Sequence, residues 1–300
     1  MTKNISCRPK ISIISIDYNG LELTCKMIES LEEKIDFPLE VIIVDNASRT
    51  DNAAEIKRRY PFVKTIRSRE NLGFAGGNNL GLKEATGDYL FFLNNDTEVL
   101  SGDITALCKA LDEDPSLGIV CPKIKFTDGT IQFAGYTEMK GISLANDLVG
   151  FCKKDDGTYD SPALSYYAHG AAMMVKREAL EEVGPMPECY FLYFEELDWS
   201  LMFRRKGWKI KYIPDFSIMH KESASVGQES PLRHYYMTRN RQIFALRNRK
   251  GIQKVLSIMY TRYLSSTKRT LKAALGKRWD IVKAIAKGNR DFLKIILCSK

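Results

Sequence analysis

The sequence lacks several features that would assign a protein to a class at once. It contains no run of eighteen or more apolar residues, which argues against a membrane-spanning helix. The first ten residues are charged and hold none of the apolar segment that a secretory signal requires, so we expect a cytoplasmic protein. No internal repeat or low-complexity segment is present either.

The cysteines exclude two further classes. The chain has seven of them, an odd number, and no Cys-x-x-Cys spacing. Neither a disulfide framework nor a zinc knuckle fits this distribution, so we interpret all seven as reduced thiols.

Acidic residues are scarce at the C-terminal end. Residues 249–300 contain 14 Lys and Arg but two acidic residues, a net charge of +12, whereas the preceding 248 residues carry 31 basic and 35 acidic side chains, a net charge of −4. This division argues against a core that binds nucleic acid. It predicts a mildly acidic globular domain over 1–248 with a basic C-terminal arm over 249–300.

Short apolar runs alternate with helical patterns in the first hundred residues, and a 44% hydrophobic composition can bury a full core. This alternation predicts an α/β fold with a mostly parallel sheet and helices on both faces. The expected elements are strands at 11–16, 39–44, 63–66 and 89–96, helices at 21–31 and 51–60, and a glycine-rich turn at 71–79 that leads into a helix ending at 85.

The pattern is less regular in the second half of the domain. Residues 126–167 are rich in Gly, Asp and aromatics, as expected of a variable insertion on the acceptor side. The other expected elements are helices at 101–112, 178–183 and 195–206, strands at 119–120, 171–175 and 208–213, and helical pieces from 230 onward.

One strand ends in a group of oxygen ligands. The apolar run Tyr89–Leu93 is followed directly by Asn94, Asn95 and Asp96. Ligands in open α/β sheets bind at the carboxyl ends of strands, and these oxygens suit Mg²⁺ or Mn²⁺ beside a diphosphate. A simple Asn/Asp turn would show the same letters.

Two further segments suggest nucleotide binding. Asp45 closes a strand, and its carboxylate could accept a hydrogen bond from a uracil or thymine N–H, although an N-cap role explains it as well. The glycines between Asn71 and Asn79 would let the backbone approach a ligand ahead of a helix N-terminus, which favours anions.

Four motifs in order resemble the family 2 glycosyltransferases of the GT-A fold, and most closely their rhamnosyltransferase-like branch. They span roughly the first 250 residues. The motifs are Val41-Ile42-Ile43-Val44-Asp45-Asn46-Ala47-Ser48, Asn71-Leu72-Gly73-Phe74-Ala75-Gly76-Gly77-Asn78, Phe92-Leu93-Asn94-Asn95-Asp96 and Phe194-Glu195-Glu196-Leu197-Asp198.

The resemblance implies a GT-A domain over 1–248, with a nucleotide-sugar half at about 10–125 and an acceptor half at 126–248. It implies inverting transfer of a sugar from a nucleoside diphosphate to an acceptor hydroxyl. The implied donor-binding residues are Asp17, Asp45, Asn46, Ser48, Gly73, Gly76, Gly77, Asn78, Asn94, Asn95, Arg239 and Arg241.

The resemblance also implies a divalent cation, Mg²⁺ or Mn²⁺, held by Asp96 and by His220, which follows a late strand. This chain has Asn94 and Asn95 where many relatives have aspartates. The site is therefore less negative, and we expect the donor diphosphate to supply part of the coordination. A lone histidine is otherwise more often structural.

Inversion needs one carboxylate to take the acceptor proton. The family's acidic motif maps its base onto Glu196, with Asp198 and Glu195 as the alternatives. These acids could also complement a helix N-terminus. The small-residue stretch His169-Gly170-Ala171 resembles the acceptor side of the family, although it could equally pack a core.

The arm repeats apolar residues at helical spacing with Lys and Arg between them. Such basic amphipathic helices bind anionic membrane surfaces without spanning them, which would place the enzyme at the inner face of the cell membrane. The alternative is that the helices pack on the catalytic domain or on a second copy in a homo-oligomer.

The sequence therefore predicts a transferase of cell-envelope polysaccharide synthesis that glycosylates a glycan or a lipid-linked saccharide. The favoured donor is dTDP-rhamnose, and the first alternative is a UDP-hexose such as galactose, glucose or N-acetylglucosamine. A second alternative, from another class, is a basic protein that binds membrane or nucleic acid and retains nucleotide affinity without catalysis. Against it, the arm lacks an aromatic RNA-reading motif.

Overall fold

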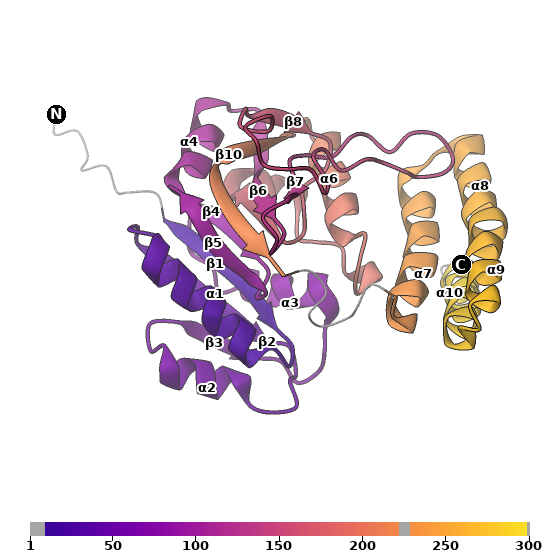
Figure 1. The fold of residues 1–300 in the computed structure, drawn as a ribbon, viewed down its shortest axis with the longest axis horizontal. Coiled ribbons are helices and arrows are strands. Elements are labelled where there is room, and N and C mark those ends of the chain that lie inside the picture. Colours follow the sequence, from indigo (N-terminus) through magenta and orange to yellow (C-terminus); the bar gives the residue numbers. More distant parts are fainter. Residues whose placement is uncertain (1–9, 222–228, 299–300) are drawn as a thin grey trace.

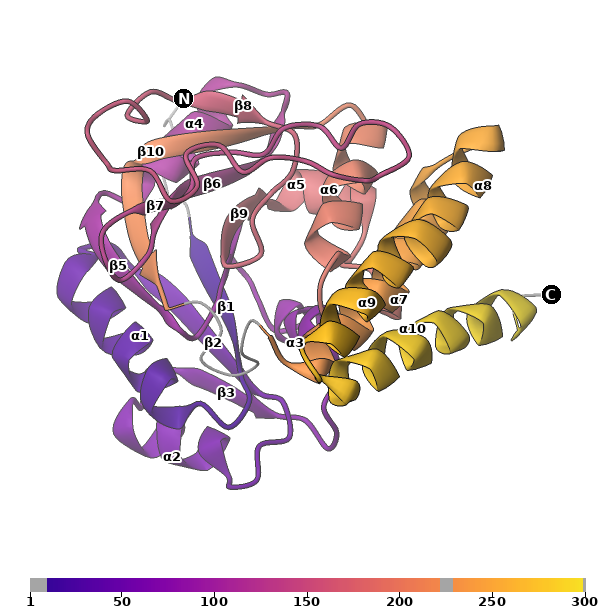
Figure 2. The same ribbon diagram turned by 45° about the vertical axis from the view of Figure 1, so that its right-hand side comes forward.

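A computed structural model describes residues 10–221 and 229–298 (Figures 1 and 2). The N-terminal segment that we interpreted as lacking a signal lies almost entirely outside these ranges. Cys7 lies outside them as well. Five of the seven cysteines are described as free thiols, as expected: Cys25, Cys108, Cys121, Cys152 and Cys189.

A single mixed sheet forms the centre of the protein, in the order β3-β2-β1-β4-β9-β6-β10-β5. The first four strands of this order are parallel, β9 is antiparallel to both of its neighbours, and β7 and β8 pair with β6 and β10. The strands are β1 (Ile11–Asp17), β2 (Leu39–Asp45), β3 (Lys64–Arg67), β4 (Tyr89–Leu93), β5 (Thr97–Gly102), β6 (Leu117–Lys125), β7 (Ile131–Phe133), β8 (Ala163–Ser165), β9 (Ala172–Lys176) and β10 (Lys209–His220).

Helices cover the sheet and continue beyond it to the C-terminus (Figure 1). The helices are α1 (Leu21–Lys34), α2 (Asn52–Arg59), α3 (Gly73–Leu82), α4 (Thr105–Glu113), α5 (Arg177–Val183), a short 3₁₀ turn η1 (Glu188–Tyr190), α6 (Glu195–Arg205), α7 (Pro231–Asn248), α8 (Gly251–Met259), a π-helical segment η2 (Tyr260–Ser265), α9 (Ser266–Leu275) and α10 (Trp279–Cys298).

The parallel part of the sheet has a switch in its winding direction between β1 and β4. The chain moves outward from β1 to β2 to β3 and then crosses back to β4. Right-handed crossovers therefore place α1 and α2 on one face and α3 on the other. The space between the carboxyl ends of β1 and β4 is the position where ligands bind in such sheets.

The structure confirms the parallel first half and corrects several elements. The expected turn at 71–79 is wrong, because α3 begins at Gly73 and contains most of those glycines. The expected helix at 101–112 begins later, since residues 97–102 form β5 against the unexpectedly long β10. Pairing of β5 with the distant β10 decided the second difference, and local patterns do not report such pairing.

The C-terminal arm is a helical subdomain, and one face of it packs on the rest of the protein. The Phe292 side chain of α10 is fully buried in a cluster with Ile243 and Phe244 of α7. The two helices approach closely at Gly288, where a Cβ would lie 2.8 Å from the Tyr235 carbonyl oxygen. This packing supports the alternative in which the arm docks on the domain, at least for α10.

A strained turn lies between η1 and α6. Three bulky residues in it, Phe191, Tyr193 and Phe194, have positive φ angles of 69°, 69° and 80°. Such conformations cost about 1–3 kcal/mol each and persist only where the surroundings impose them. Here the Asn240 side chain of α7 provides the restraint, because its Nδ2 lies 2.7–3.0 Å from the carbonyl oxygens of residues 190, 192 and 193.

Replacing Asn240 should therefore destabilise the protein. Asn240→Ala leaves buried carbonyl groups without a donor, and we expect the free energy of unfolding to fall by about 3 kcal/mol in urea denaturation. Asn240→Asp should be no better, since a carboxylate cannot donate. Gln253→Ala, which removes an exposed amide from α8, is the control, and an equal loss in that variant would contradict the role of Asn240.

Candidate functional site

A pocket of about 290 Å³ opens at the switch point between β1 and β4. Its floor comes from the residues that follow these strands, Tyr18–Gly20 and Asn94–Asp96. Its walls come from the start of α3 and from the strained turn, and include Gly73, Phe74 and Phe191. Of the expected donor-binding residues, the pocket contains Asn46, Gly73, Asn94 and Asn95.

Asp17 lies beneath this pocket and has no exposed surface. Its carboxylate accepts hydrogen bonds from Thr24 Oγ1 at 2.7 Å, Ser48 Oγ at 3.1 Å and Asn52 Nδ2 at 2.6 Å, while Asn95 Nδ2 lies 3.4 Å away. The protein thus satisfies this charge itself. Asp17 holds the ends of β1, β2 and β4 together, and its contact with a donor stays a prediction.

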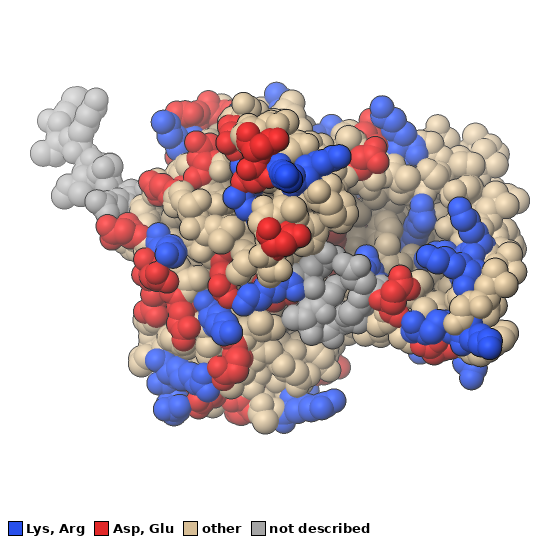
Figure 3. Space-filling model, viewed as in Figure 1, with Lys and Arg blue, Asp and Glu red and all other residues tan. Residues whose placement is uncertain are grey.

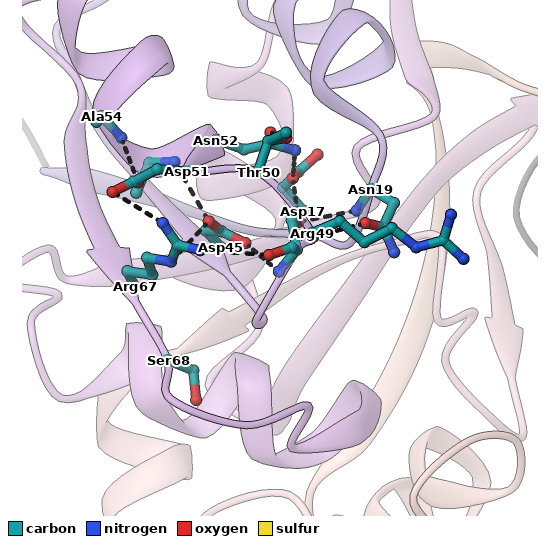
Figure 4. A network of polar contacts seen from close by, with 12 residues as sticks. Asp17, Asn19, Asp45, Arg49, Thr50, Asp51, Asn52, Ala54, Arg67 and Ser68 are labelled. Carbon is teal, nitrogen blue, oxygen red and sulfur yellow. Dashed lines mark hydrogen bonds and ion pairs between the residues drawn. The ribbon is translucent and has the colours of Figure 1, made fainter.

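Asp45 lies beside Asp17, in register with it across the two strands (Figure 4). It is also fully buried, and it accepts the Ser48 backbone N–H at 2.8 Å. Arg67 approaches Asp45 to 3.6 Å and forms a closer ion pair with Asp51 at 2.8 Å. Ser48 and Arg67 line a neighbouring hollow of about 440 Å³, and recognition of a base there stays a prediction.

The glycines of α3 serve helix packing. A Cβ at Gly77 would lie 2.9 Å from Ile16 Cδ1, and one at Gly76 would lie 2.8 Å from Leu72 Cβ. Asn78 donates to the Phe74 carbonyl within the same helix. These contacts explain why glycine stands at 76 and 77 and asparagine at 78 without the expected close approach of a donor.

Asn46 connects the end of β2 to the start of α3. Its Nδ2 donates to the Gly73 carbonyl at 3.0 Å and to Asn71 Oδ1 at 3.1 Å, and its Oδ1 accepts the Leu72 N–H at 2.9 Å. Gly73 has a φ of +71° and would clash with the Phe191 carbonyl if it carried a Cβ. Asn46 and Gly73 therefore shape the pocket wall through the backbone.

Asp96 and His220 meet although 124 residues separate them. Asp96 Oδ1 lies 3.2 Å from His220 Nε2, and both side chains are largely buried. Gln132 Oε1 lies 2.9 Å from the other ring nitrogen, Nδ1, which therefore donates its proton to that amide oxygen. Nε2 is then the atom that faces Asp96, which is the arrangement of a histidine that holds a metal.

These two groups fit an open cation site. Among the described residues, no group of three or more His, Cys, Asp or Glu could enclose a metal ion. Asp96 and His220 could hold Mg²⁺ or Mn²⁺ only if other ligands complete the shell, and phosphate oxygens and water are the usual ones. Asn94 keeps its backbone in place by donating its N–H to the Ala171 carbonyl at 2.9 Å.

Glu196 lies across the pocket wall from this pair. A Cβ at Gly170 would be 3.6 Å from Glu196 Cγ and 3.7 Å from Phe74 Cζ, so these three residues adjoin. Burial raises the pKa of Glu196 to about 7. Burial, followed by the charge of Glu196, raises the pKa of Glu195 well above its ordinary value.

The three candidate bases differ in their surroundings. Glu195 is buried, and its Oε1 accepts the Tyr193 N–H at 3.0 Å. Asp198 has no exposed surface, accepts the Tyr190 hydroxyl at 2.9 Å and pairs with Arg247 Nε at 2.5 Å. These contacts bind Oδ2 of Asp198, while its Oδ1 has no partner among the described residues, so the alternative of Asp198 as the base stays a prediction. Glu196 alone of the three is partly exposed.

The expected acceptor stretch His169-Gly170-Ala171 lies between the cation pair and Glu196. The His169 ring is 6.2 Å from the His220 ring, centre to centre, and stacks on Tyr136. Burial lowers the pKa of His169 to about 3, so the ring is neutral. Ala171 is buried, whereas His169 and Gly170 are partly exposed.

The two expected phosphate-binding arginines point elsewhere. Arg239 stacks on Tyr236 and donates to the Tyr190 carbonyl, which supports the strained turn. Arg241 donates to the Ser143 carbonyl and to Ser265 Oγ, and neither arginine lines the pocket. Both form contacts that support the fold, and their binding of phosphate stays a prediction.

Sequence reasoning missed three residues that shape the site. Asn240 lies between the two arginines of the Arg-Asn-Arg segment, and an amide flanked by charges was the available signal. Asn79 binds the backbone of Met186 through both its side-chain groups. Gln132, which orients His220, lies in the irregular stretch and has no local signal.

Comparison with solved structures supports the fold. The chain superposes on GalNAc-T7 with UDP, GalNAc and Mn²⁺ with a TM-score of 0.59 at 16% identity, covering 87% of this chain and 57% of that one. It superposes on the mannosyltransferase PcManGT from Pyrobaculum calidifontis, in complex with GDP-Man and Mn²⁺, with a TM-score of 0.56 at 17% identity, covering 96% and 88%.

Comparison of sequences supports the family. A curated relative, the N-acetylglucosaminyl-diphospho-decaprenol L-rhamnosyltransferase of Mycobacterium tuberculosis, is 24% identical over 241 residues, which is 73% of this chain and 78% of the relative. The model of Glycosyl transferase family 2 matches residues 12–184, more than half of the chain. With the GT-A fold and the switch-point pocket in place, the chain belongs to family 2 of the glycosyltransferases, enzymes that use nucleotide sugars.

Proposed function

We propose that this protein is a cation-assisted inverting glycosyltransferase that transfers rhamnose from dTDP-rhamnose to a hydroxyl of a lipid-linked saccharide or glycan in cell-envelope polysaccharide synthesis. The observation that supports the proposal is that Asp96, which lines the pocket, pairs with His220, while Glu196 adjoins Phe74 of the same pocket's wall through Gly170. The name of the mycobacterial relative supports the sugar and the acceptor class.

The residues divide the reaction between them. A cation at Asp96 and His220 would neutralise the charge that grows on the leaving diphosphate. Glu196 takes the proton of the acceptor hydroxyl as its oxygen bonds to the anomeric carbon. The carbon–oxygen bond to the diphosphate breaks on the opposite face, so the configuration inverts. Burial keeps the pKa of Glu196 near that of a working base.

The donor has one strong alternative. A UDP-hexose fits the same reaction, and the solved GalNAc-T7 complex contains UDP. Nucleotide release measured over a panel of dTDP- and UDP-sugars separates the two. Release from none of them would favour the non-catalytic binding protein and would contradict the proposed function.

The outer face of the C-terminal helices fits a membrane surface. No helix in the described part of the chain is long and apolar enough to cross a bilayer. Large apolar side chains are nevertheless exposed along α8, η2 and α9, among them Ile252 at 69%, Leu264 at 65% and Leu275 at 87%. Lys and Arg gather on the same end of the molecule (Figure 3). We propose that this face holds the enzyme on anionic lipid at the inner side of the cell membrane.

Glu196→Gln should lower kcat by about 10²–10⁴-fold without weakening donor binding, because the amide cannot take a proton. Since the base works ionised and its pKa is about 7, kcat/KM of the wild type should rise from pH 6 to pH 8 and then level. Glu195→Gln is the matched control, because the amide resembles the protonated acid that burial favours. A larger loss of kcat in Glu195→Gln or in Asp198→Asn than in Glu196→Gln would show that the substituted acid, and not Glu196, is the base.

Asp96→Ala should abolish Mn²⁺-dependent turnover and weaken binding of the nucleoside diphosphate in the presence of Mn²⁺. Among the described residues, this carboxylate is the charged ligand that we propose for the cation. Titration calorimetry with UDP and with dTDP, each with Mn²⁺ and with EDTA, measures the effect. Wild-type affinity and turnover in this variant would remove the cation from the mechanism.

Leu264→Asp and Leu275→Asp should each reduce sedimentation with phosphatidylglycerol vesicles, because a carboxylate opposes both the apolar contact and the anionic lipid. Deleting the whole arm is a poorer test, since α10 packs on α7. Phe62→Asp, at an exposed position after α2, is the control. Unchanged sedimentation of both variants with the vesicles would contradict the membrane contact. A molecular mass of the protein that doubles with its concentration in the absence of lipid would indicate that this face forms a homo-oligomer contact instead.

A further inference from the structure

A second hollow, of about 360 Å³, lies away from the switch-point pocket, between α6, the end of α7 and the irregular loops. Its polar lining comes from Glu138, Tyr166, Arg204, Arg205, Asn248 and Arg249. Three guanidinium groups and one carboxylate leave a formal charge of +2 on these walls. Nothing in the proposed reaction uses them.

The arginines are held in place without carboxylate partners. Arg204 lies over the Tyr166 ring with its Cζ 3.8 Å from the ring centre. Arg205 donates to Asn248 Oδ1, and Arg249 donates to the Met139 carbonyl at 2.7 Å. Among the described residues, none of the three forms an ion pair with Asp or Glu. The one carboxylate of the hollow, Glu138, accepts the Tyr166 hydroxyl at 2.8 Å.

Two donor groups in this hollow are buried and have no acceptor. Asn248 Nδ2 and Arg249 Nε both lack a hydrogen-bond partner among the described residues. A buried donor without a partner costs about 1–3 kcal/mol, so native proteins rarely keep one without a reason. Both orphan groups belong to residues that line the hollow beside guanidinium groups, and a ligand rich in acceptor oxygens would satisfy them once their side chains turn toward it.

We infer that this hollow is an oxyanion subsite that binds the phosphate or diphosphate of a lipid-linked acceptor. Arginine forks match phosphate oxygens in paired hydrogen bonds, which supports this ligand over a neutral sugar. The assignment rests on the proposed function, because it places the acceptor sugar between the hollow and the pocket. Beyond the proposed function, the assignment names the anionic group of the acceptor and the residues that bind this group.

The position of the hollow on α6 suits this role. Leu201, which lines the hollow, follows Glu196 by five residues, or about 7.5 Å along the helix axis. On the opposite wall, Tyr167 precedes His169 of the acceptor stretch by two residues. Leu201 is also turned by about 140° around the helix axis from Glu196, so in our proposal the saccharide passes along the wall at Tyr167 to bring its hydroxyl to Glu196.

The same hollow adjoins the face that we assign to the membrane. Arg249 is followed two residues later by the start of α8, and Ile252 at the first turn of that helix is strongly exposed. The apolar chain of a lipid-linked acceptor would thus leave the hollow toward the bilayer. This continuity favours a lipid-linked phosphate over a free anion.

Titration calorimetry with farnesyl diphosphate and with inorganic diphosphate tests the inference. EDTA is present throughout, so that a cation cannot hold a diphosphate in the donor pocket. We expect the full-length protein to bind farnesyl diphosphate more tightly than inorganic diphosphate. Arg204→Gln, which removes a fork, and Asn248→Asp, which replaces an orphan donor by a negative charge of the same shape, should each weaken this binding at least tenfold.

Arg58→Gln, which removes an exposed charge from α2, is the matched control and should leave the affinity unchanged. Equal affinity in the wild type and both hollow variants would overturn the inference. Equal affinity of the wild type for farnesyl diphosphate and inorganic diphosphate would contradict the assignment of the hollow to a lipid-linked phosphate. Hydrolysis of the donor sugar without acceptor, measured in the same proteins, reports the proposed function separately, since it needs no oxyanion subsite.

Discussion

The restraint that Asn240 places on the turn at 190–194 is the interaction on which the site depends. Three aromatic residues with positive φ would relax if they were free, and each relaxation would move a different part of the pocket. Phe191 forms the pocket wall and accepts the Phe74 N–H at 2.7 Å, while Phe194 precedes the first residue of α6. One amide on α7 therefore keeps the start of α3 and the acids of α6 at their mutual positions.

The carboxylates of the site divide according to how fully the protein satisfies them. Asp17 and Asp45 are completely buried, and donors surround each one, whereas the equally buried Asp198 is bonded through Oδ2 and its Oδ1 has no hydrogen-bond partner among the described residues. Saturated groups of this kind stiffen the scaffold, because moving them would expose an unpaired charge. Asp96 lines the pocket and Glu196 adjoins its wall through Gly170 and Phe74, and both have fewer partners. This difference is why the proposed reaction uses Asp96 and Glu196.

The helix α7 connects several parts of the molecule that would otherwise act separately. It carries Asn240 against the strained turn, Asn248 in the arginine-lined hollow, and the apolar surface on which α10 packs. A helix is rigid over its length, since each turn is bonded to the next. Asn240 and Asn248 are eight residues, or about 12 Å, apart on this helix, so the arginine-lined hollow is in fixed register with the strained turn.

Much of the donor half could be predicted from the sequence, because local periodicity sets each strand and the strand ends carry their polar residues directly after them. The α/β class, the parallel strands and the oxygen ligands after β4 all follow from this. Tertiary structure alone decided which carboxylates are reachable: Asp17 and Asp96 both follow apolar strands, yet one is enclosed by four neighbours and the other faces His220. Tertiary structure also decided that the glycines of α3, which the sequence suggested as a ligand-binding turn, pack against neighbouring residues. It likewise decided that Asn240 contacts a turn some fifty residues earlier in the chain. The physical reason is that burial and partner choice depend on contacts between residues distant in the chain, and no local pattern of letters encodes those.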